Sequence, residues 1–465
     1  MRIAADRAWA REEFGDAALG SKRRTDRLIA MAAGVASAPD GRITSVFCDG
    51  ASREGSFRFV ENGHIHPRAI AEAPYRAAAR RASAYSYVFV PVDGTSLNII
   101  DRKRTKGLGL IGSRGFGVTG MQVMSAIAVA PDGAPLGLCD IRFWTRLRRS
   151  PRCGRHDKRD VRQKETAHWL DAVGSVHQNF VAHAPNCTPW FQLDRGADAR
   201  PVLELCLARG LTATVRASWN RSLWKGGAAP DRYLWEYLDR KRIQGTTSIE
   251  VPPRNGQPRR VANLSIRFAE VVLDLHNDHR RHRRPGRFSA VLVRETGVVP
   301  CGQARIEWLL LTTYTVEDLD DALAVIDGYA TRWTIEEFHR TWKSGACDVE
   351  TTQLRAVDHI ERWATILAAV AIRIVRLAKL ARTEPELPAT VELKQSEIDA
   401  IILTKKRTKY SPGQTPTIGE AVTWLAEIGG YTGKSSGGPP GPQVISRGML
   451  RLQALADYLE RQGEK

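Results

Sequence analysis

Two β-prone runs of this chain each end in an aspartate, and this pattern constrains the fold more strongly than any other feature. The first run, Tyr85-Ser-Tyr-Val-Phe-Val-Pro-Val, reaches Asp93. The second, from Pro189 to Leu193, reaches Asp194. β-branched and aromatic residues favour strands, and a sheet fixes an acid at the end of a strand and leaves it facing an open edge. Aspartate also often begins a turn, so each acid taken alone has an ordinary structural explanation.

The patterns around these runs predict an α/β middle region between two helical ends. Residues 1–70 are polar with helical spacing, and the tail after about 366 is mainly helical. Pro131-Asp-Gly133 indicates a hairpin turn between two strands. The expected strands are Met121–Ala130, Leu136–Trp144, Leu211–Arg216, Thr246–Val251, Leu264–Leu275, Ser289–Val293 and Trp308–Thr313, and the expected helices are Trp9–Phe14, Arg24–Ala36, Arg53–Val60, Gln163–Val176, Ala199–Arg209, Val316–Lys343 and Asp358–Ala381.

The segment Tyr329–Lys343, with the sequence YATRWTIEEFHRTWK, carries the most informative side chains. On one helix, Tyr329, Arg332, Glu336 and Lys343 would fall within an arc of roughly 60°. An ordinary amphipathic helix with ion pairs would give the same pattern. Phosphate chemistry gives these residue types a purpose, because a carboxylate binds Mg²⁺ while Arg, Lys and Tyr hold an anionic backbone.

The formal charge of +18 points to a polyanionic partner. Basic residues occur in runs, at 22–27, 102–106, 146–162, 280–287 and 405–409, although a single run is usually a solvated surface. The seven cysteines form no CxxC pair, which argues against a disulfide framework or a zinc ribbon. The chain also lacks an apolar run of the ~18 residues that a membrane span needs, and its first residues lack a secretory signal. We therefore expect a cytoplasmic protein.

The three acidic motifs occur in an order that resembles a known family. They are Val92-Asp93-Gly-Thr-Ser96, Asp194-Arg-Gly-Ala-Asp198 and the Tyr-Arg-Glu-Lys segment. Together they resemble the DDE transposases of the bacterial insertion-sequence-four family, especially cut-and-paste enzymes of the composite-transposon-five type. The similarity runs through most of the chain and includes Gly20–Thr25, Glu54–Asn62, Trp308–Thr313 and Ile428–Tyr431.

This resemblance implies an RNase H-like core in which Asp93, Asp194 and Glu336 hold two Mg²⁺ ions, with Mn²⁺ as a substitute, at about 3.5–4 Å separation. It also implies a helical domain at 1–70 that binds transposon ends, a catalytic domain at 71–365 with a β-rich insertion at about 225–310, and a helical dimerisation domain at 366–465. The partners would be double-stranded DNA, at the ends and at the target, and a second copy of the chain. The implied DNA-binding residues are Lys22, Arg23, Arg24, Arg27, Arg216, Arg221, Tyr329, Arg332, Lys343 and Trp308.

Two points in this interpretation leave alternatives open. Trp308 would stack on a base extruded during hairpin formation, but a buried strand aromatic is the alternative. The second motif departs from the usual Asp-Arg-Glu-Ala-Asp, because Gly196 replaces the glutamate. Two other functions fit the same residues: an RNase H-like nuclease that cuts without joining, and an inactive DNA-binding inhibitor of transposition. Retention of all three acids argues against the inhibitor.

Overall fold

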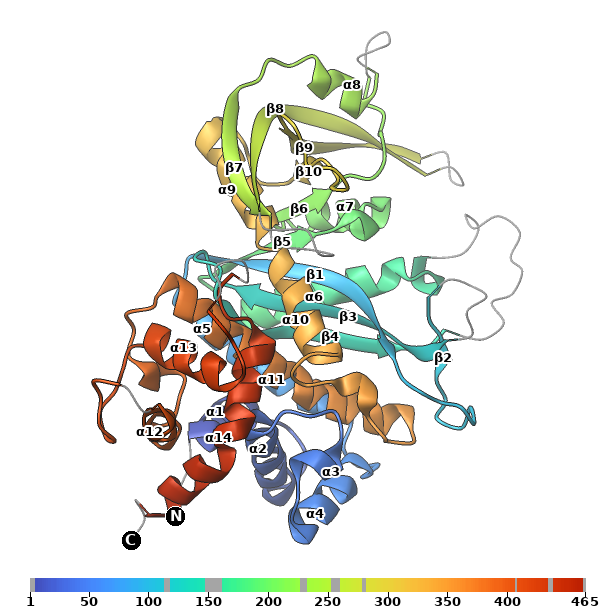
Figure 1. Ribbon diagram of the computed structural model, residues 1–465. Helices are drawn as coiled ribbons and strands as arrows, with labels where there is room; N and C mark the ends of the chain where they lie inside the picture. Colours follow the sequence, from blue (N-terminus) through green and yellow to red (C-terminus); the bar gives the residue numbers. More distant parts are fainter. Residues whose placement is uncertain are drawn as a thin grey trace.

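The computed structural model describes residues 5–112, 118–146, 161–225, 232–251, 260–277, 282–405, 408–433 and 438–462. The basic runs at 146–162, 280–287 and 405–409 lie partly outside these residues. A mixed sheet runs through the middle of the molecule, and helices from both ends of the chain pack together below it (Figure 1). Within the described ranges, no helix is long and apolar enough to cross a bilayer.

The described strands form one sheet. They are β1 (Tyr87–Asn98), β2 (Gly109–Leu110), β3 (Thr119–Val129), β4 (Pro135–Trp144), β5 (Thr188–Leu193), β6 (Ala213–Arg216), β7 (Gly245–Val251), β8 (Arg260–Asn277), β9 (His282–Glu295) and β10 (Glu307–Thr312). Their order is β2-β3-β1-β5-β6-β10-β9-β8-β7, with β4 paired to β3. β1, β5 and β6 are parallel neighbours, and the other pairs are antiparallel. The predicted strands are all present, and β7 to β9 form the expected β-rich insertion between β6 and β10.

The helices lie on both sides of the sheet and beneath it (Figure 1). They are α1 (Ala5–Phe14), α2 (Lys22–Ser37), α3 (Ile43–Val46), α4 (Gly50–Val60), α5 (Pro67–Ala82), α6 (Thr166–His183), α7 (Arg200–Ala208), α8 (Leu234–Asp239), α9 (Leu319–Ala330), α10 (Trp333–Lys343), α11 (Val357–Thr383), α12 (Gln395–Thr404), α13 (Ile418–Ile428) and α14 (Pro442–Gln462). This arrangement confirms the expected α/β fold class with helical flanks.

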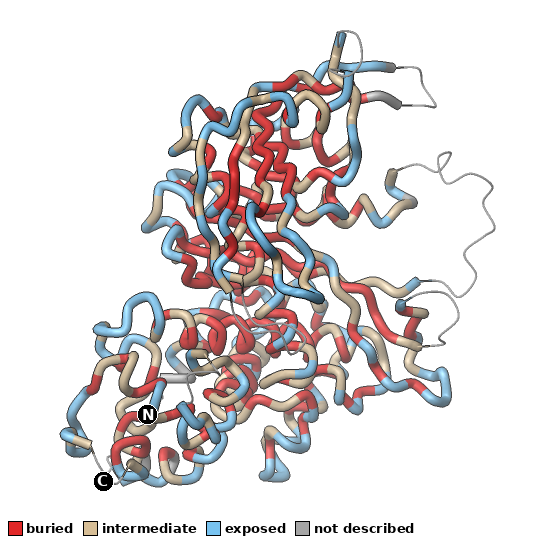
Figure 2. Tube along the Cα trace, turned by 45° about the horizontal axis from the view of Figure 1, so that its top comes forward, coloured by how far each residue is buried: buried red, intermediate tan, exposed pale blue. Residues whose placement is uncertain are grey.

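Alternate residues of β1 face opposite sides of the sheet, as the pleat requires. Val88, Val90 and Val92 are buried in one hydrophobic cluster with residues of α6 and α7. Phe89 is buried in a second cluster with residues of α9, α10 and α11. Figure 2 shows this burial concentrated in the strands and in the helices against them. Asp93 has the parity of Phe89, so β1 directs it to the side of the sheet that α10 covers.

The helical segment expected from Val316 to Lys343 is two helices rather than one. α9 ends at Ala330 and α10 begins at Trp333. Around the junction, the amides of Arg332, Thr334 and Ile335 donate to the carbonyl three residues earlier. Such tighter turns replace the α-helical pattern and rotate one helix relative to the other. The expectation that Tyr329 and Lys343 lie on one continuous helix stripe was therefore wrong.

The helix α5 was not predicted from the sequence. Pro74 stands in its interior, which argues against a helix, whereas Pro67 occupies its first turn, where proline is well tolerated. Its buried stripe includes Ile70, Tyr75 and Ala78. The Tyr75 hydroxyl accepts from the Ile141 amide at 2.7 Å and lies 3.1 Å from the Ile141 carbonyl, which fixes α5 to β4. Packing against the sheet thus stabilises a helix that local propensity alone does not favour.

The long helix α11 connects the N-terminal helices with the rest of the molecule. Its Arg362 donates to the carbonyls of Val60 and Ile65, both at 2.6 Å, and its Trp363 donates to the Gly41 carbonyl at 2.8 Å. The C-terminal end of α11 packs in a separate hydrophobic cluster with α12, α13 and α14. The expected helical tail is therefore confirmed, and the N-terminal helices share their core with α10 and α11.

Candidate active site

The register of β1 against β5 brings Asp93 and Asp194 together. The two strands are parallel, and Val92 lies opposite Leu193. Asp93 and Asp194 are the next residues on the two strands, so they leave the sheet side by side. β1 does not end at Asp93, as the sequence suggested, because its pairing with β3 continues to Asn98. Asp93 instead lies at the point where β5 ends and one side of β1 becomes free.

The helix α10 carries the third acid, Glu336, and Arg332 links it to Asp93. Arg332, which precedes α10, donates from Nη1 to Asp93 Oδ2 at 3.1 Å and from Nη2 to Glu336 Oε1 at 2.5 Å. Its side chain is only 10% exposed. Further along α10, Lys343 Nζ donates to Thr95 Oγ1 at 3.2 Å, so the helix follows β1 beyond Asp93. Residues separated by more than 200 positions in sequence thus form one cluster of alternating charge.

The acids outnumber the cations that contact them. Burial raises the pKa of Asp93 to about 7, and the nearby charge of Asp194 adds to this, while Arg332 opposes it. For Arg332, burial would lower the pKa, but Tyr329, Asp93 and Glu336 raise it, so the guanidinium stays charged. Among the described residues, no three His, Cys, Asp or Glu side chains converge closely enough to hold a metal. The three acids are neighbours, with the guanidinium between two of them.

Three polar atoms beside the acids are buried without a hydrogen-bond partner in the described part of the chain. They are Arg216 Nε, Tyr329 Oη and Arg332 Nε. Burying an unpaired donor costs about 1–3 kcal/mol, so such groups are retained where a ligand satisfies them. Arg216 and Tyr329 lie close together, since each affects the other's pKa. The arrangement offers N–H and O–H donors to an anion at the edge of the acidic cluster.

A buried histidine, which sequence reasoning missed, positions α10 on the sheet. His339 Nε2 and Ser125 Oγ are 2.6 Å apart, and Ser125 lies opposite Asp93 in the β1–β3 register. Burial lowers the pKa of His339 to about 3, so the ring is neutral at pH 7. His339 follows Glu336 by three residues, close to one helical turn, and this spacing was the available signal. The pair fixes the turn of α10 that carries Glu336.

The second motif uses its last acid for structure. Asp198 is 2% exposed, and its carboxylate accepts from Arg221 Nη2 at 2.6 Å. The sequence assigned Arg221 to DNA, but the structure commits its guanidinium to Asp198. The substitution at Gly196 also has a physical basis. A Cβ at this position would lie 3.0 Å from Asp194 Oδ1 and 3.3 Å from the Trp169 ring, so a glutamate would require a local shift.

Trp308 lies in the core rather than at the surface. It is 4% exposed on β10, a strand with neighbours on both sides. Its ring contacts the rings of Tyr329 and Trp333, at centroid distances of 5.1 Å and 6.2 Å. This position matches the buried strand aromatic that the sequence left as the alternative, and it does not present the ring to DNA. Trp308 instead supports Tyr329 from beneath.

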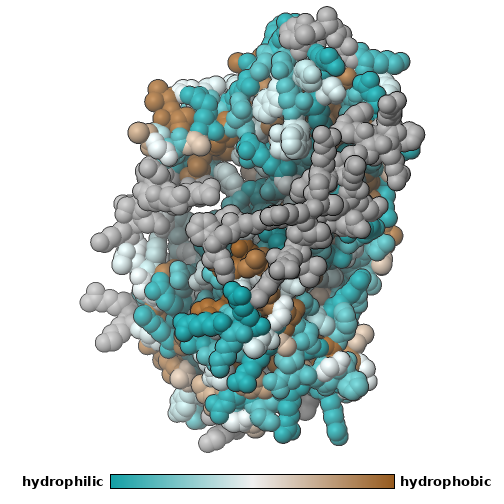
Figure 3. Space-filling model, turned by 90° about the vertical axis from the view of Figure 1, so that its right-hand side faces the viewer, coloured by the Kyte–Doolittle hydropathy of each residue, from teal (hydrophilic) through white to brown (hydrophobic). Residues whose placement is uncertain are grey.

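The predicted basic residues near the N-terminus lie on α2, away from the acidic cluster. Lys22, Arg23 and Arg27 are exposed. Arg24 is partly buried and donates to the Leu19 carbonyl at 2.9 Å. Figure 1 places α2 below α11, with the sheet on the other side of α11. The face drawn in Figure 3 is mainly hydrophilic over the residues that it colours. The exposed basic side chains of Lys22, Arg23 and Arg27 on α2 therefore lie apart from the acidic cluster.

Comparison with known families identifies these regions. Residues 6–65 match a model described as transposase DNA-binding, residues 156–373 match a transposase DDE domain, and residues 369–463 match a transposase Tn5 dimerisation domain. The chain is built from transposase domains. Its catalytic core is RNase H-like, as expected. The DDE match contains Asp194 and Glu336 but begins after Asp93, which the strand register places beside Asp194.

DDE domains use divalent cations, and the donor atoms of the acidic cluster suit such an ion, although its three carboxylates do not converge on one point in the described chain, where Arg332 lies between two of them. Its donors are carboxylate oxygens, the ligands that Mg²⁺ and Mn²⁺ prefer. Burial and the neighbouring Asp194 raise the pKa of Asp93, so its ionised form is favoured only by positive charge placed beside it. Arg332 supplies part of that charge by bridging Asp93 and Glu336.

Proposed function

We propose that this protein is a cut-and-paste transposase of the insertion-sequence-four family. It binds the ends of its DNA element, cuts them through a hairpin intermediate and joins them to target DNA. The observation that carries the proposal is the cluster in which Arg332 links Asp93 to Glu336 while the strand register places Asp194 beside Asp93. The matching DNA-binding, DDE and dimerisation models support the same assignment.

Asp93, Asp194 and Glu336 are the residues that would hold two Mg²⁺ ions. When bound, such ions activate a water or a 3′-hydroxyl and stabilise the departing oxygen. The protein's own contribution is to place the acids. The sheet fixes Asp93 and Asp194, and the His339–Ser125 contact fixes the turn of α10 that bears Glu336.

Arg216, Tyr329, Arg332 and Lys343 would hold the DNA backbone beside the acids. The unpartnered donors of Arg216, Tyr329 and Arg332 support this role, because a phosphate oxygen would satisfy them. Arg332 has a second role before DNA and metal bind, since its charge is shared between Asp93 and Glu336. These four side chains would together position the scissile phosphate next to the acids.

The two flanking regions would select and pair the ends. We propose domain boundaries near residues 70 and 365, with Lys22, Arg23, Arg24 and Arg27 contacting end DNA. The active species would be a dimer that holds two ends, with pairing through the region after residue 366. Exposed basic residues on α2 and the match to a dimerisation domain support these two roles.

The test is a reaction of the purified protein with DNA that carries the ends of its own element. In Mg²⁺ we expect nicked ends, then hairpins, then products joined to a target plasmid, resolved on denaturing gels. Asp93→Asn and Glu336→Gln should each lower cleavage about a thousandfold or more while end binding persists, because they remove charge from the cation site with little change in shape.

The alternatives give different products. A nuclease without strand transfer would give nicks or breaks but neither hairpins nor joined product. An inactive inhibitor would bind the ends and yield no cleavage in Mg²⁺ or Mn²⁺. Near-normal cutting by Asp93→Asn or Glu336→Gln would remove that residue from the proposed triad.

A further inference from the structure

The guanidinium of Arg332 lies between two acids that a bound cation would have to share. Its Nη1 donates to Asp93 Oδ2 at 3.1 Å, and its Nη2 donates to Glu336 Oε1 at 2.5 Å. Carboxylate oxygens are also the atoms that a divalent cation binds. In the described chain the acids do not converge into a group that could hold a metal. Arg332 therefore keeps Asp93 and Glu336 on either side of itself.

A guanidinium and a divalent cation cannot share these oxygens. Arginine keeps its charge at every pH at which proteins fold, so Arg332 cannot make room by losing a proton. Its side chain is only 10% exposed. Like charges in contact at such a site repel strongly, because little water screens them. A cation between Asp93 and Glu336 therefore requires that Arg332 first move away.

A phosphate group offers Arg332 a better set of contacts than the two acids do. Asp93 and Glu336 take one Nη each, and Arg332 Nε is buried without a hydrogen-bond partner in the described chain. Nε and one Nη together form the fork that binds a phosphate through two parallel hydrogen bonds. Tyr329 Oη is also buried and unpartnered, and the Tyr329 ring centre lies 5.8 Å from Arg332 Cζ. An anion at this edge of the cluster would satisfy both groups.

We propose that Arg332 is an internal counter-ion that keeps the metal site closed in the free protein and opens it when a DNA phosphate binds. This rests on the proposed function, because the DNA backbone is the anion that draws the guanidinium away from the acids. DNA and the cation then favour each other's binding, and by linkage the two effects are equal in size. The free protein binds a divalent cation weakly, and the metal site forms mainly on DNA.

A neighbouring arginine provides the matched control. Arg340 lies on α10 one turn after Glu336 and is exposed. Among the described ion pairs, none joins Arg340 to Asp93 or Glu336. Arg340→Gln removes the same charge from the same helix but does not open the space between the acids. An effect of charge at a distance would appear in this variant, whereas an effect of occupancy requires a change at Arg332.

The first measurement is Mn²⁺ binding to the purified full-length protein without DNA, followed by the electron paramagnetic resonance of free Mn²⁺. Arg332→Gln should bind Mn²⁺ about tenfold more tightly than wild type, because a site that is mostly closed lowers the apparent affinity by its open fraction. Arg332→Lys keeps the charge but loses the planar fork, so it should also bind more tightly than wild type. Arg340→Gln should stay within about twofold of wild type, because solvent and salt screen an exposed charge.

The second measurement adds a duplex with the precleaved element end and a dideoxy 3′-terminus, which cannot react. The Mn²⁺ affinity of the wild type should rise about tenfold on this DNA. Arg332→Gln should gain less, since its site is already open. Asp93→Asn on the same DNA measures the Mn²⁺ that the DNA itself binds. Without DNA, the double variant Asp93→Asn with Arg332→Gln should lose the tight binding, which locates that binding at the acidic cluster.

Equal or weaker Mn²⁺ binding by folded Arg332→Gln without DNA would overturn the proposal, as would an equal gain in Arg340→Gln. A gain that persists in the double variant would also overturn it, because the ion would then lie elsewhere. Circular dichroism checks the folding of each variant. If Arg332→Gln does not fold, Arg332→Lys and the wild type with DNA decide in the same way. These outcomes leave the proposed function intact as long as the wild type cuts and joins its ends, whereas a wild type that does not cut would remove that function.

Discussion

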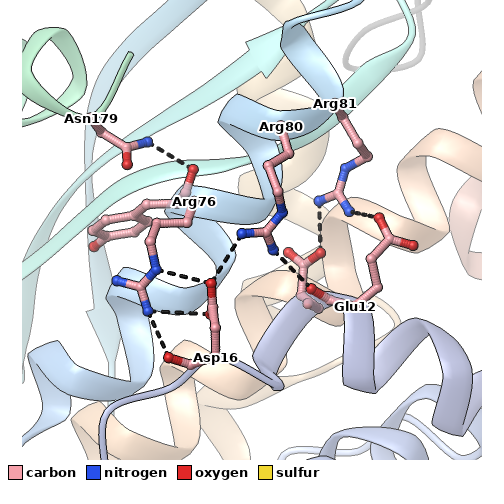
Figure 4. Close-up of polar contacts among 8 residues, drawn as sticks. Glu12, Asp16, Arg76, Arg80, Arg81 and Asn179 are labelled. Carbon is pink, nitrogen blue, oxygen red and sulfur yellow. Dashed lines mark hydrogen bonds and ion pairs between the residues drawn. The ribbon is translucent and has the colours of Figure 1, made fainter. Parts of the chain in front are cut away.

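Two clusters of acids and arginines in this transposase are built from the same groups and differ in their balance. At the junction of α1 and α5, Glu12, Glu13 and Asp16 contact Arg76, Arg80 and Arg81 (Figure 4). In the candidate active site, Arg332 bridges Asp93 and Glu336, and Asp194 adds a further negative charge beside Asp93. The first cluster is balanced in charge, and the second carries excess negative charge.

The pKa shifts differ between exposed and buried acids, and at the junction burial outweighs Arg81 and raises the pKa of Glu13. Burial would raise the pKa of Asp16, but hydrogen bonds from Arg76 and Arg80 lower it. At Asp93, burial and the charge of Asp194 outweigh Arg332, and the pKa rises to about 7. The junction therefore favours the ionised form of Asp16, whereas Asp93 favours its neutral form until a cation binds beside it. The difference teaches that ion pairs close in geometry can serve opposite purposes.

The largest effect on stability is expected from the buried part of the junction. Arg81→Ala removes the cation that contacts Glu13, whose side chain is 3% exposed. A buried charge left without its partner typically costs about 3–5 kcal/mol, so we expect a loss of that size in the free energy of unfolding. Urea denaturation followed by circular dichroism measures it.

The control separates the stranded charge from lost packing. The double variant Glu13→Ala with Arg81→Ala should be no less stable than Arg81→Ala, because no unpaired carboxylate remains. Cleavage per folded molecule should be unchanged in both, since neither residue contacts the acidic cluster. If the double variant loses as much free energy of unfolding as the two single variants added together, and both losses are large, the pair acts through packing and not through charge.

The second prediction is a gain in the free energy of unfolding rather than a loss. Because the folded-state pKa of Asp93 is about 7, above its ordinary value of 3.8, the folded chain binds this proton more tightly than the unfolded chain. Its contribution is therefore present at low pH and is lost as pH rises from about 4 through about 7. Asp93→Asn removes that loss, so in EDTA the variant should be more stable than wild type at pH 8 by on the order of 2–4 kcal/mol.

The measurement is urea denaturation of both proteins at pH 5 and pH 8. The difference in the free energy of unfolding between Asp93→Asn and wild type should be larger at pH 8 than at pH 5. Mg²⁺ should reduce this difference by stabilising the wild type alone. A gap that stays constant across this range would show that Asp93 titrates at its ordinary pKa and that the active site is already neutralised within the protein.

The sequence predicted the components of the active site better than their connections. Strand patterns located Asp93 and Asp194, and the described strands confirm both runs. Helical spacing singled out Arg332 and Glu336, and the resemblance assigned their roles. What local patterns could not show was register: Val92 opposite Leu193 makes the two acids neighbours, and this depends on long-range pairing. The break between α9 and α10 was also hidden, because Thr331 and Arg332 do not disfavour a helix.

Burial was the other property that the sequence left open. Trp308 and Trp219 are both tryptophans near strands, yet the first lies on a central strand and the second on a loop after an inner strand. Arg221 and Arg216 are both basic residues after the second acid, yet the first pairs with Asp198. Assigning such residues requires knowing which side chain each one contacts in the fold, and that partner is distant in sequence.

The smallest expected effect concerns Asp16, and its pH dependence opposes that of Asp93. Its pKa is lowered in the folded chain by Arg76 and Arg80, so its stabilisation is present above its ordinary pKa and is lost as pH falls. The carboxylate is 38% exposed, and solvent screening limits the contribution to about 0.2–1 kcal/mol. Asp16→Asn should therefore be slightly less stable than wild type at pH 7 and equal to it near pH 3. Salt at about 1 M should reduce the difference at pH 7, because the Debye length then falls to about 3 Å. Asp93→Asn should become more stable relative to wild type as pH rises. If Asp16→Asn did the same, both clusters would carry excess negative charge and the contrast between them would not hold.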